Sequence, residues 1–260
     1  MVNRSNGGRN FAILFRKTSM TRYFAIVLCV LVALVTTSAR SARGQQLEVS
    51  VSHGAIYDID RAVQRSLQTP TTQQNTALRF IGRAFNWWGG PGVIWFAALC
   101  WLGGRLLKRT VLSEIGLRGL EAIAVASALS GIIKGFAGRS RSFLTPGEPW
   151  HWSFAHGWTD ARYFSMPSGH TTATFAFAAA VTVAAARVPR FRAAIVIAGF
   201  SSAGLVGFAR VFTNQHWLSD VIVGALVGLI TGIVVVRWHN RYPHSAFDRR
   251  LLGIPTETNG

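Results

Sequence analysis

The chain has 260 residues, of which 50% are hydrophobic and 14% are charged, and its 27 Lys and Arg residues against 10 Asp and Glu residues give a net charge of +17. This hydrophobic content excludes an intrinsically disordered chain. The mean hydropathy is +0.29, and the apolar residues form long uncharged blocks, which favours an integral membrane protein over a soluble domain. The basic residues lie between these blocks, so they indicate membrane topology and not a nucleic-acid-binding surface.

Six apolar stretches are candidates for membrane-spanning helices, each of which needs about 20 mostly apolar residues. They are residues 23–39, 84–104, 117–136, 163–186, 193–209 and 221–236. The third contains Glu121, and the last two are short. The sequence therefore predicts an all-α fold, a polytopic membrane helical bundle of about six spanning helices.

Basic residues gather in four short segments beside these spans. They are Arg4, Arg9, Arg16, Lys17 and Arg22; Arg105, Lys108 and Arg109; Arg187, Arg190 and Arg192; and Arg237, Arg241, Arg249 and Arg250. If six helices alternate, all four segments fall on one side, which the positive-inside rule identifies as the cytoplasm. We therefore expect a protein of the cell (inner) membrane whose other loops face the periplasm or the cell exterior.

The first apolar stretch has other interpretations. A basic start, an apolar run and small residues at its end also describe a cleavable signal peptide, and the absence of acidic residues before Glu48 is also typical of an organelle transit peptide. Removing the stretch leaves the second helix entering from the same side.

Between the first two spans, residues 55–67 and 75–87 mix apolar and charged residues at helical spacing. We expect helices that lie on the membrane surface or cover the bundle. Four tryptophans near span ends are expected at the membrane interface; they are Trp87, Trp88, Trp217 and Trp238. The predicted organisation is a cytoplasmic tail (1–22), a first spanning helix or signal anchor (23–39), an outer-side loop with amphipathic helices (40–86), a core bundle (87–238) and a cytoplasmic tail (239–260).

Three groups of ionisable residues lie at the outer ends of the predicted spans. They are Lys134, Arg139 and Arg141; His170; and Arg210, His216 and Asp220. Ionisable groups at membrane depth are costly and commonly mark a functional path, although a single such cation is more often a helix-end anchor. Together these residues supply several cations and two histidines with one nearby acid, which suits the charge of a phosphoryl group.

His216 and Asp220 are four residues apart. If the sixth helix begins near Trp217, both side chains project from one side, and Asp220 accepts a hydrogen bond from one imidazole nitrogen. The other nitrogen is then free for nucleophilic attack.

Ser168 and Gly169 open the fourth predicted spanning helix, where unpaired N–H groups and the helix dipole attract anions. His170 follows them and can protonate a departing alkoxide. Two histidines and an aspartate are also potential metal ligands, but the surrounding cations repel a divalent ion. We therefore expect no metal and no cofactor.

At these residues the sequence resembles the type-2 phosphatidic acid phosphatase superfamily, which contains membrane lipid phosphate phosphatases. The motifs of that family are Lys-x6-Arg-Pro, Pro-Ser-Gly-His and Ser-Arg-x5-His-x3-Asp. The matching positions are Lys134 and Arg141, Pro167 to His170, and Arg210, His216 and Asp220. Ser142 replaces the usual Pro, which puts the rigidity of that loop in doubt, and Ala209 replaces the usual Ser, which removes one hydroxyl contact.

The resemblance implies a phosphatase core that removes phosphate from a membrane lipid phosphate or diphosphate without a metal, on the outer face of the membrane. His216 would become phosphorylated, His170 would act as general acid and Asp220 would orient His216. The substrate-binding residues that it implies are Lys134, Arg141, Ser168, Gly169 and Arg210. The expected partners are the lipid substrate and the bilayer, and no nucleic acid is expected. The sequence does not indicate the oligomeric state.

Candidate lipids are undecaprenyl pyrophosphate, phosphatidic acid, phosphatidylglycerol phosphate and a lipid A phosphate. Vanadate-dependent peroxidase chemistry is an alternative within the same fold. A second alternative is a non-catalytic transporter or partner protein whose cationic pocket binds an anion. The Trp- and His-rich loop 138–165 either covers the site and selects headgroups or only packs on the bundle.

Overall fold

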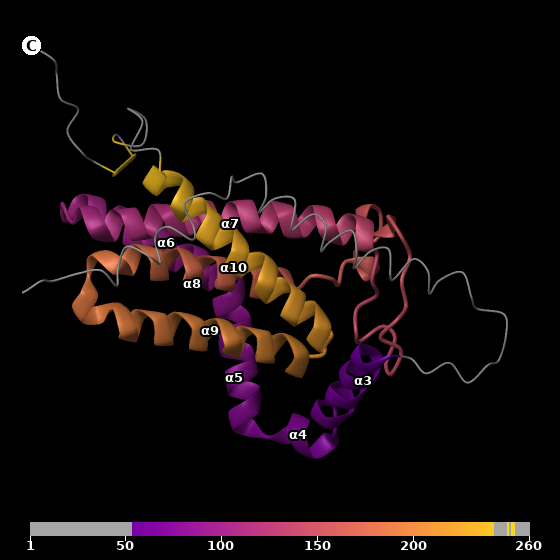
Figure 1. Ribbon diagram of the computed structural model, residues 1–260. Helices are drawn as coiled ribbons and strands as arrows, with labels where there is room; N and C mark the ends of the chain where they lie inside the picture. Colours follow the sequence, from indigo (N-terminus) through magenta and orange to yellow (C-terminus); the bar gives the residue numbers. More distant parts are fainter. Residues whose placement is uncertain (1–53, 242–248, 250, 253–260) are drawn as a thin grey trace, which may run out of the picture. The chain divides into compact units, whose positions relative to one another are not determined.

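The computed structural model describes residues 54–241, 249 and 251–252, which are helical apart from turns, loops and two isolated bridges from Arg139 to Trp152 and to Phe164 (Figure 1). The predicted first span, 23–39, lies outside the described residues. The helices are α3 Ala55–Leu67, α4 Pro70–Gln74, α5 Thr76–Trp87, α6 Val93–Leu106, α7 Thr110–Ala137, α8 Gly169–Ala184, α9 Arg192–Phe212 and α10 Leu218–Arg241. The short turns are the π turn η1 Trp88–Gly92 and the 3₁₀ turns η2 His156–Trp158, η3 Ala161–Tyr163, η4 Ala185–Arg187 and η5 Pro189–Phe191.

Three helices of the described residues are long and apolar enough to cross a membrane. They are Thr110–Ala137, Pro189–Phe212 and Leu218–Arg241, and they contain the predicted spans 117–136, 193–209 and 221–236. The count of six spans, and the domain boundaries built on it, stay predictions.

The predicted span 84–104 is broken at η1. Pro91 cannot donate a backbone hydrogen bond, and Gly90 has non-helical dihedral angles of −90° and −108°. The stretch is therefore divided among α5, η1 and α6. The predicted span 163–186 is shorter than expected, since α8 has 16 residues and begins only at Gly169.

Glycines allow α8 and α10 to approach closely. Gly224, Gly228 and Gly232 recur every four residues on α10 and face α8. A Cβ atom at Gly224 would lie 2.7 Å from the Ser168 carbonyl oxygen, so only glycine fits this contact. The approach lets the Ser168 N–H donate to the Asp220 carbonyl oxygen at 2.9 Å.

Four helix ends meet at one end of the bundle, because α7 and α9 finish there while α8 and α10 begin there. The α6–α7 connection, the α8–α9 connection and the last turn of α10 lie at the opposite ends of these helices (Figure 1). Those opposite ends carry most of the basic residues that the sequence analysis used for topology.

The helices expected over 55–67 and 75–87 are present as α3 and α5. Of the two placements expected for them, α3 has the second: it covers the bundle and buries Tyr57, Asp60 and Gln64. These polar residues contact the loop after α7 and the start of α10. Part of the segment 40–86 therefore belongs to the surroundings of the predicted site.

Candidate active site

Lys134, in the last turn of α7, is directed toward the start of α8. Its Nζ donates to the carbonyl oxygens of Phe164 and Ser165, both at 3.0 Å, and lies 5.0 Å from the centre of the Phe164 ring. A Cβ atom at Gly169 would lie 3.7 Å from Lys134 Cε. Two of the three ammonium N–H groups are thus occupied, and the third remains to bind a ligand.

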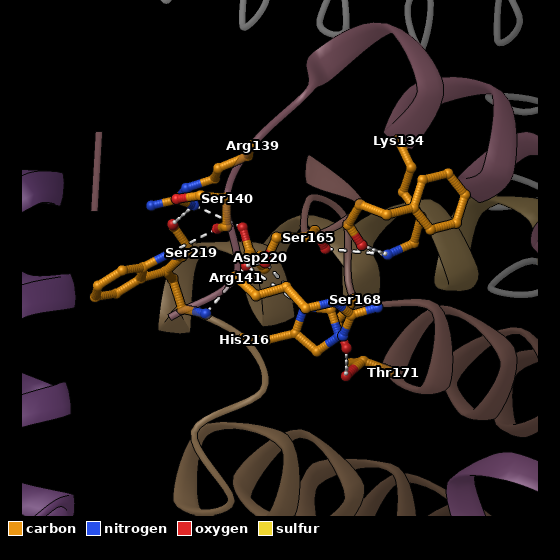
Figure 2. Close-up of polar contacts among 12 residues, drawn as sticks. Lys134, Arg139, Ser140, Arg141, Ser165, Ser168, Thr171, His216, Ser219 and Asp220 are labelled. Atoms are coloured by element: carbon orange, nitrogen blue, oxygen red, sulfur yellow. Dashed lines mark hydrogen bonds and ion pairs between the residues drawn. The ribbon is translucent and has the colours of Figure 1, made fainter. Parts of the chain in front are cut away.

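His216 and Asp220 lie together at the start of α10 (Figure 2). His216 Nδ1 is 3.5 Å from Asp220 Oδ2 and 3.3 Å from Ser165 Oγ. Asp220 Oδ2 also accepts hydrogen bonds from Ser165 Oγ at 2.6 Å and from the Trp217 N–H at 3.0 Å. Because α10 begins at Leu218, His216 precedes the helix, and Ser165 shares the contact that the sequence assigned to the pair alone.

Arg139 is a counter-ion of Asp220. Its Nη1 donates to Asp220 Oδ1 and to Ser219 Oγ, both at 2.6 Å (Figure 2). Its Nη2 donates to Asp60 Oδ2 at 2.7 Å. Its Nε donates to the Pro149 carbonyl oxygen at 2.9 Å. With these partners, Arg139 is occupied by protein groups and is not placed to bind a substrate.

Trp217 lies in the interior and not at the membrane interface. Only 1% of it is exposed, its ring centre is 5.6 Å from the Arg139 guanidinium, and its Nε1 donates to the Ser140 carbonyl oxygen at 3.2 Å. The interfacial prediction was wrong here because the indole N–H finds a partner inside the protein. Trp87 and Trp238 are exposed, and their location at the membrane interface stays a prediction.

Arg210, near the end of α9, has a buried side chain with spare hydrogen-bonding capacity. Its Nη1 donates to Asn86 Oδ1 at 2.6 Å, while its buried Nε has no partner among the described residues. Asn86, in α5, is itself held by a donation from its Nδ2 to Thr213 Oγ1 at 3.3 Å. A buried guanidinium with an unpaired donor indicates a place for an anion.

Arg141 lies in the loop after α7, with its Nε 3.4 Å from the Ala161 carbonyl oxygen. Burial lowers the pKa of its guanidinium, while the negative charge of Asp220 opposes that effect. The next residue, Ser142, is held by α3: Gln64 Nε2 donates to its carbonyl oxygen at 2.9 Å. Since Gln64 Oε1 also accepts from the Gly147 N–H at 2.9 Å, α3 supplies a restraint on the loop in the absence of the usual proline.

The start of α8 places Ser168, Gly169 and His170 next to these groups. Ser168 Oγ accepts a hydrogen bond from Thr171 Oγ1 at 3.0 Å, which leaves the Ser168 hydroxyl proton free to donate. The Ser168 N–H is used by Asp220, so the amides that open the helix are those of Gly169 and His170. His170 Nε2 lies beside Gly90, where a Cβ atom would be only 3.1 Å away.

His216 is neutral at neutral pH. Burial lowers the pKa of its imidazole to about 3; hydrogen bonding and charge attraction from Asp220 oppose this effect, while the positive charge of Lys134 adds to it. A neutral imidazole whose Nδ1 faces Asp220 and Ser165 retains a lone pair on Nε2.

The positive charges of the site are unequally compensated. Asp60 and Asp220 both pair with Arg139. Lys134, Arg141 and Arg210 form no ion pair with a carboxylate within the part of the chain that the structure describes. The site thus combines a buried histidine with three uncompensated cations.

The site contacts include four residues that the sequence did not predict, namely Asp60, Gln64, Asn86 and Ser165. For the first two a signal exists, because Tyr57, Asp60 and Gln64 have the i, i+3, i+7 spacing of one helix face. Such a polar stripe predicts a face that contacts other polar groups. Asn86 and Ser165 have no comparable signal, since their roles depend on distant residues.

Residues 116–243 match the family model described as the PAP2 superfamily. This segment of the chain belongs to the PAP2 superfamily. The match begins within α7, extends beyond α10 and includes every predicted site residue. Asp60, Gln64 and Asn86 precede the matched segment.

The PAP2 chain is similar to two curated bacterial proteins named lipid A 1-phosphatase. It is 39% identical to that of Porphyromonas gingivalis over 69 residues, which cover 26% of this chain and 15% of the relative. It is 32% identical to that of Rhizobium etli over 133 residues, which cover 48% of this chain and 52% of the relative. The chain thus spans about half, or less, of the lengths of these relatives.

The fold is similar to the crystal structure of the first transmembrane PAP2-type phosphatidylglycerolphosphate phosphatase from Bacillus subtilis. The TM-score is 0.57 at 18% identity, and the superposition covers 83% of this chain and 97% of the other. The two proteins therefore share a fold. The spanning helices, together with these membrane relatives, identify an integral membrane protein.

Proposed function

We propose that this PAP2 protein is a metal-independent phosphatase that hydrolyses a membrane lipid phosphate or diphosphate through a phosphohistidine intermediate. One observation carries the proposal: the buried, neutral His216 contacts Asp220 while Lys134, Arg141 and Arg210 have no carboxylate partner. A neutral nucleophile among uncompensated cations suits attack on a phosphoryl group.

In the first step, His216 Nε2 attacks phosphorus and the bond from phosphorus to the lipid oxygen breaks. His170 gives a proton to the leaving oxygen. In the second step, His170 takes a proton from water, the water oxygen attacks phosphorus, and the nitrogen–phosphorus bond breaks to release inorganic phosphate. The Nδ1 proton stays directed toward Ser165 and Asp220 throughout, so Asp220 stabilises the positive charge that develops on the ring.

The substrate-binding groups are the three cations, the Ser168 hydroxyl and the opening amides of α8. Lys134, Arg141 and Arg210 compensate the charge on the equatorial oxygens, which is the main requirement of phosphoryl transfer. The Gly169 and His170 amides add the anion-binding character of a helix start.

The substrate headgroup lies at the outer face of the cell (inner) membrane in this proposal. The site is at one end of the bundle, and the basic α6–α7 and α8–α9 connections and the basic last turn of α10 are at the other, which the positive-inside rule places in the cytoplasm. The similarity to proteins named lipid A 1-phosphatase favours a phosphorylated glycolipid as the substrate over the other candidate lipids.

The test is phosphate release from a panel of lipid phosphates in detergent with EDTA, comparing the parent with His216→Ala. We expect release by the parent and none above background from the variant. His239→Gln is a matched control, because this histidine lies roughly 28 Å along α10 from Asp220 at 1.5 Å per residue. Equal rates for the parent and His216→Ala reject the mechanism. Lipid binding without phosphate release by either favours the non-catalytic alternative.

A further inference from the structure

Asp60 is a buried carboxylate that comes from outside the matched segment. Only 2% of it is exposed, although it lies on α3, a helix with a largely exposed surface. Its Oδ1 accepts from the Ser219 N–H at 2.8 Å, and its Oδ2 accepts from Ser219 Oγ at 2.6 Å and from Arg139 Nη2 at 2.7 Å. A buried carboxylate needs such compensation, because an isolated buried charge is strongly unfavourable.

Arg139 connects Asp60 to the proposed nucleophile. The two Nη atoms of its guanidinium reach Asp60 Oδ2 and Asp220 Oδ1, at 2.7 Å and 2.6 Å. The central carbon of the guanidinium also lies 4.9 Å from the centre of the Trp152 ring and 5.6 Å from that of the Trp217 ring. Because the guanidinium is a rigid planar fork, a change at one end alters the contact at the other.

We infer that Asp60 is a positioning residue for the His216–Asp220 pair, acting through Arg139 and through the first turn of α10. This inference rests on the proposed function. Asp60 shares the positive charge of Arg139 with Asp220. With Asp60 ionised, two carboxylates face one guanidinium, so Asp220 keeps a net negative charge toward the imidazole. Without the Asp60 carboxylate, the whole positive charge of Arg139 faces Asp220 and neutralises it.

The consequence for His216 follows from electrostatics. A neutralised Asp220 is a weaker acceptor for the Nδ1 proton, so the imidazole loses its preference for the tautomer that leaves Nε2 free. A neutralised Asp220 also stabilises the positive charge on the phosphohistidine ring less than an ionised Asp220 does. Substrate binding depends on other groups, since Lys134, Arg141 and Arg210 do not contact Asp60.

A purely structural role predicts a different outcome. Asp60 also accepts from the Ser219 N–H in the first turn of α10, so its loss lowers stability in either case. A helix cap alone leaves the histidine tautomer and the turnover of each folded molecule unchanged. The experiment must therefore read the imidazole directly.

The experiment compares Asp60→Asn with Asp58→Asn, an exposed carboxylate on the same helix. Turnover of a lipid phosphate accepted by the parent is measured in detergent, per folded molecule. We expect Asp60→Asn to lower kcat by about 10- to 100-fold with KM changed by less than about twofold, and Asp58→Asn to match the parent. Equal effects of the two substitutions overturn the inference.

The second readout is the ¹⁵N spectrum of labelled histidine at neutral pH, in which His216→Gln identifies the His216 signals. We expect the Nδ1–H tautomer in the parent and in Asp58→Asn, and a mixture of tautomers in Asp60→Asn. An unchanged tautomer in Asp60→Asn overturns the inference. Since this measurement needs no turnover, a parent that releases no phosphate rejects the proposed function while the spectrum still tests Asp60.

A conservative variant covers the case in which Asp60→Asn does not fold. Asp60→Glu keeps the negative charge beside Arg139, and we expect it to retain the parent tautomer with kcat reduced by less than about tenfold. A mixture of tautomers in a folded Asp60→Glu protein contradicts the electrostatic account.

Discussion

At the scale of single residues, the surroundings of Asp220 determine what its substitution does. Its two carboxylate oxygens contact Arg139, Ser165, the Trp217 N–H and His216. An amide in the same place keeps the shape but loses the charge, and it cannot satisfy the same donors. Asp220 therefore matters both for the tautomer of His216 and for the interior that holds Arg139.

We predict that Asp220→Asn lowers turnover by about 10³- to 10⁴-fold, as expected for an imidazole held in the wrong tautomer. It also lowers the free energy of unfolding by about 1–3 kcal/mol, because Arg139 loses its charge-assisted hydrogen bond to Asp220. Arg139 keeps Asp60 as its other partner. Turnover and the thermal unfolding midpoint in detergent measure the two effects. Parent-like turnover in a folded Asp220→Asn protein contradicts the role of Asp220.

The buried imidazole of His216 also predicts a dependence of stability on pH. Its pKa is lowered to about 3 in the folded protein, against about 6.5 in an unfolded chain. Between these values the unfolded state binds more protons, so this residue reduces stability as the pH falls from about 6.5 toward 3. The difference in unfolding midpoint between the parent and His216→Gln, measured across this range, isolates the effect. A difference that does not vary with pH refutes the lowered pKa.

At the scale of elements, the contact between α8 and α10 sets the geometry of the site. His170 is in the first turn of α8, and Asp220 is in the first turn of α10. The glycines of α10 bring the two backbones together, and the Ser168 N–H bonds to the Asp220 carbonyl oxygen. A side chain inserted into this contact must move one helix relative to the other.

We predict that Gly228→Ala lowers both stability and turnover, because the added Cβ would overlap the Thr172 carbonyl oxygen and the backbone nitrogen of Ala176. Overpacking of this kind costs about 1–3 kcal/mol, measured as a lower thermal unfolding midpoint. Gly204→Ala on α9 is the control, since a Cβ there has nothing within 4 Å. Equal stability of the two alanine variants contradicts close packing of α8 on α10.

The contact of α5 with α9 sets the availability of Arg210. Asn86 accepts a hydrogen bond from Arg210 without neutralising its charge. We predict that Asn86→Asp raises KM for a lipid phosphate by about tenfold or more, because the new carboxylate competes with the substrate for the guanidinium. The effect on kcat is smaller. Steady-state kinetics in detergent measure both constants, with Asn86→Gln as the neutral control. An unchanged KM in Asn86→Asp indicates that Arg210 does not bind the phosphate.

At the scale of the whole molecule, the separation of the basic connections from the site predicts the orientation in the membrane. The loop containing Thr159 is at the site end, and Phe191, which is 57% exposed, lies in the connection at the other end. If the site faces outward, these two positions lie on opposite sides of the bilayer.

We predict that an impermeant thiol reagent added to intact spheroplasts labels Thr159→Cys, and that it labels Phe191→Cys only after the membrane is opened. Both substitutions are made in a chain whose Cys29 and Cys100 are replaced by Ala. The opposite labelling pattern places the site in the cytoplasm and contradicts the proposed outer-face activity. It leaves the chemistry of the site to the phosphate-release test.

The sequence by itself determined the helical class, the positions of α3, α7, α9 and α10 and the meeting of Lys134, His170 and His216 at one end. These features follow from hydrophobic length and from spacing along the chain. Only the tertiary structure decided that Arg139 is the counter-ion of Asp220, that Trp217 is interior and that Asp60 pairs with Arg139. The physical reason is that charge pairing depends on distance in space: Asp60 and Arg139 are 79 residues apart in sequence but 2.7 Å apart in the fold.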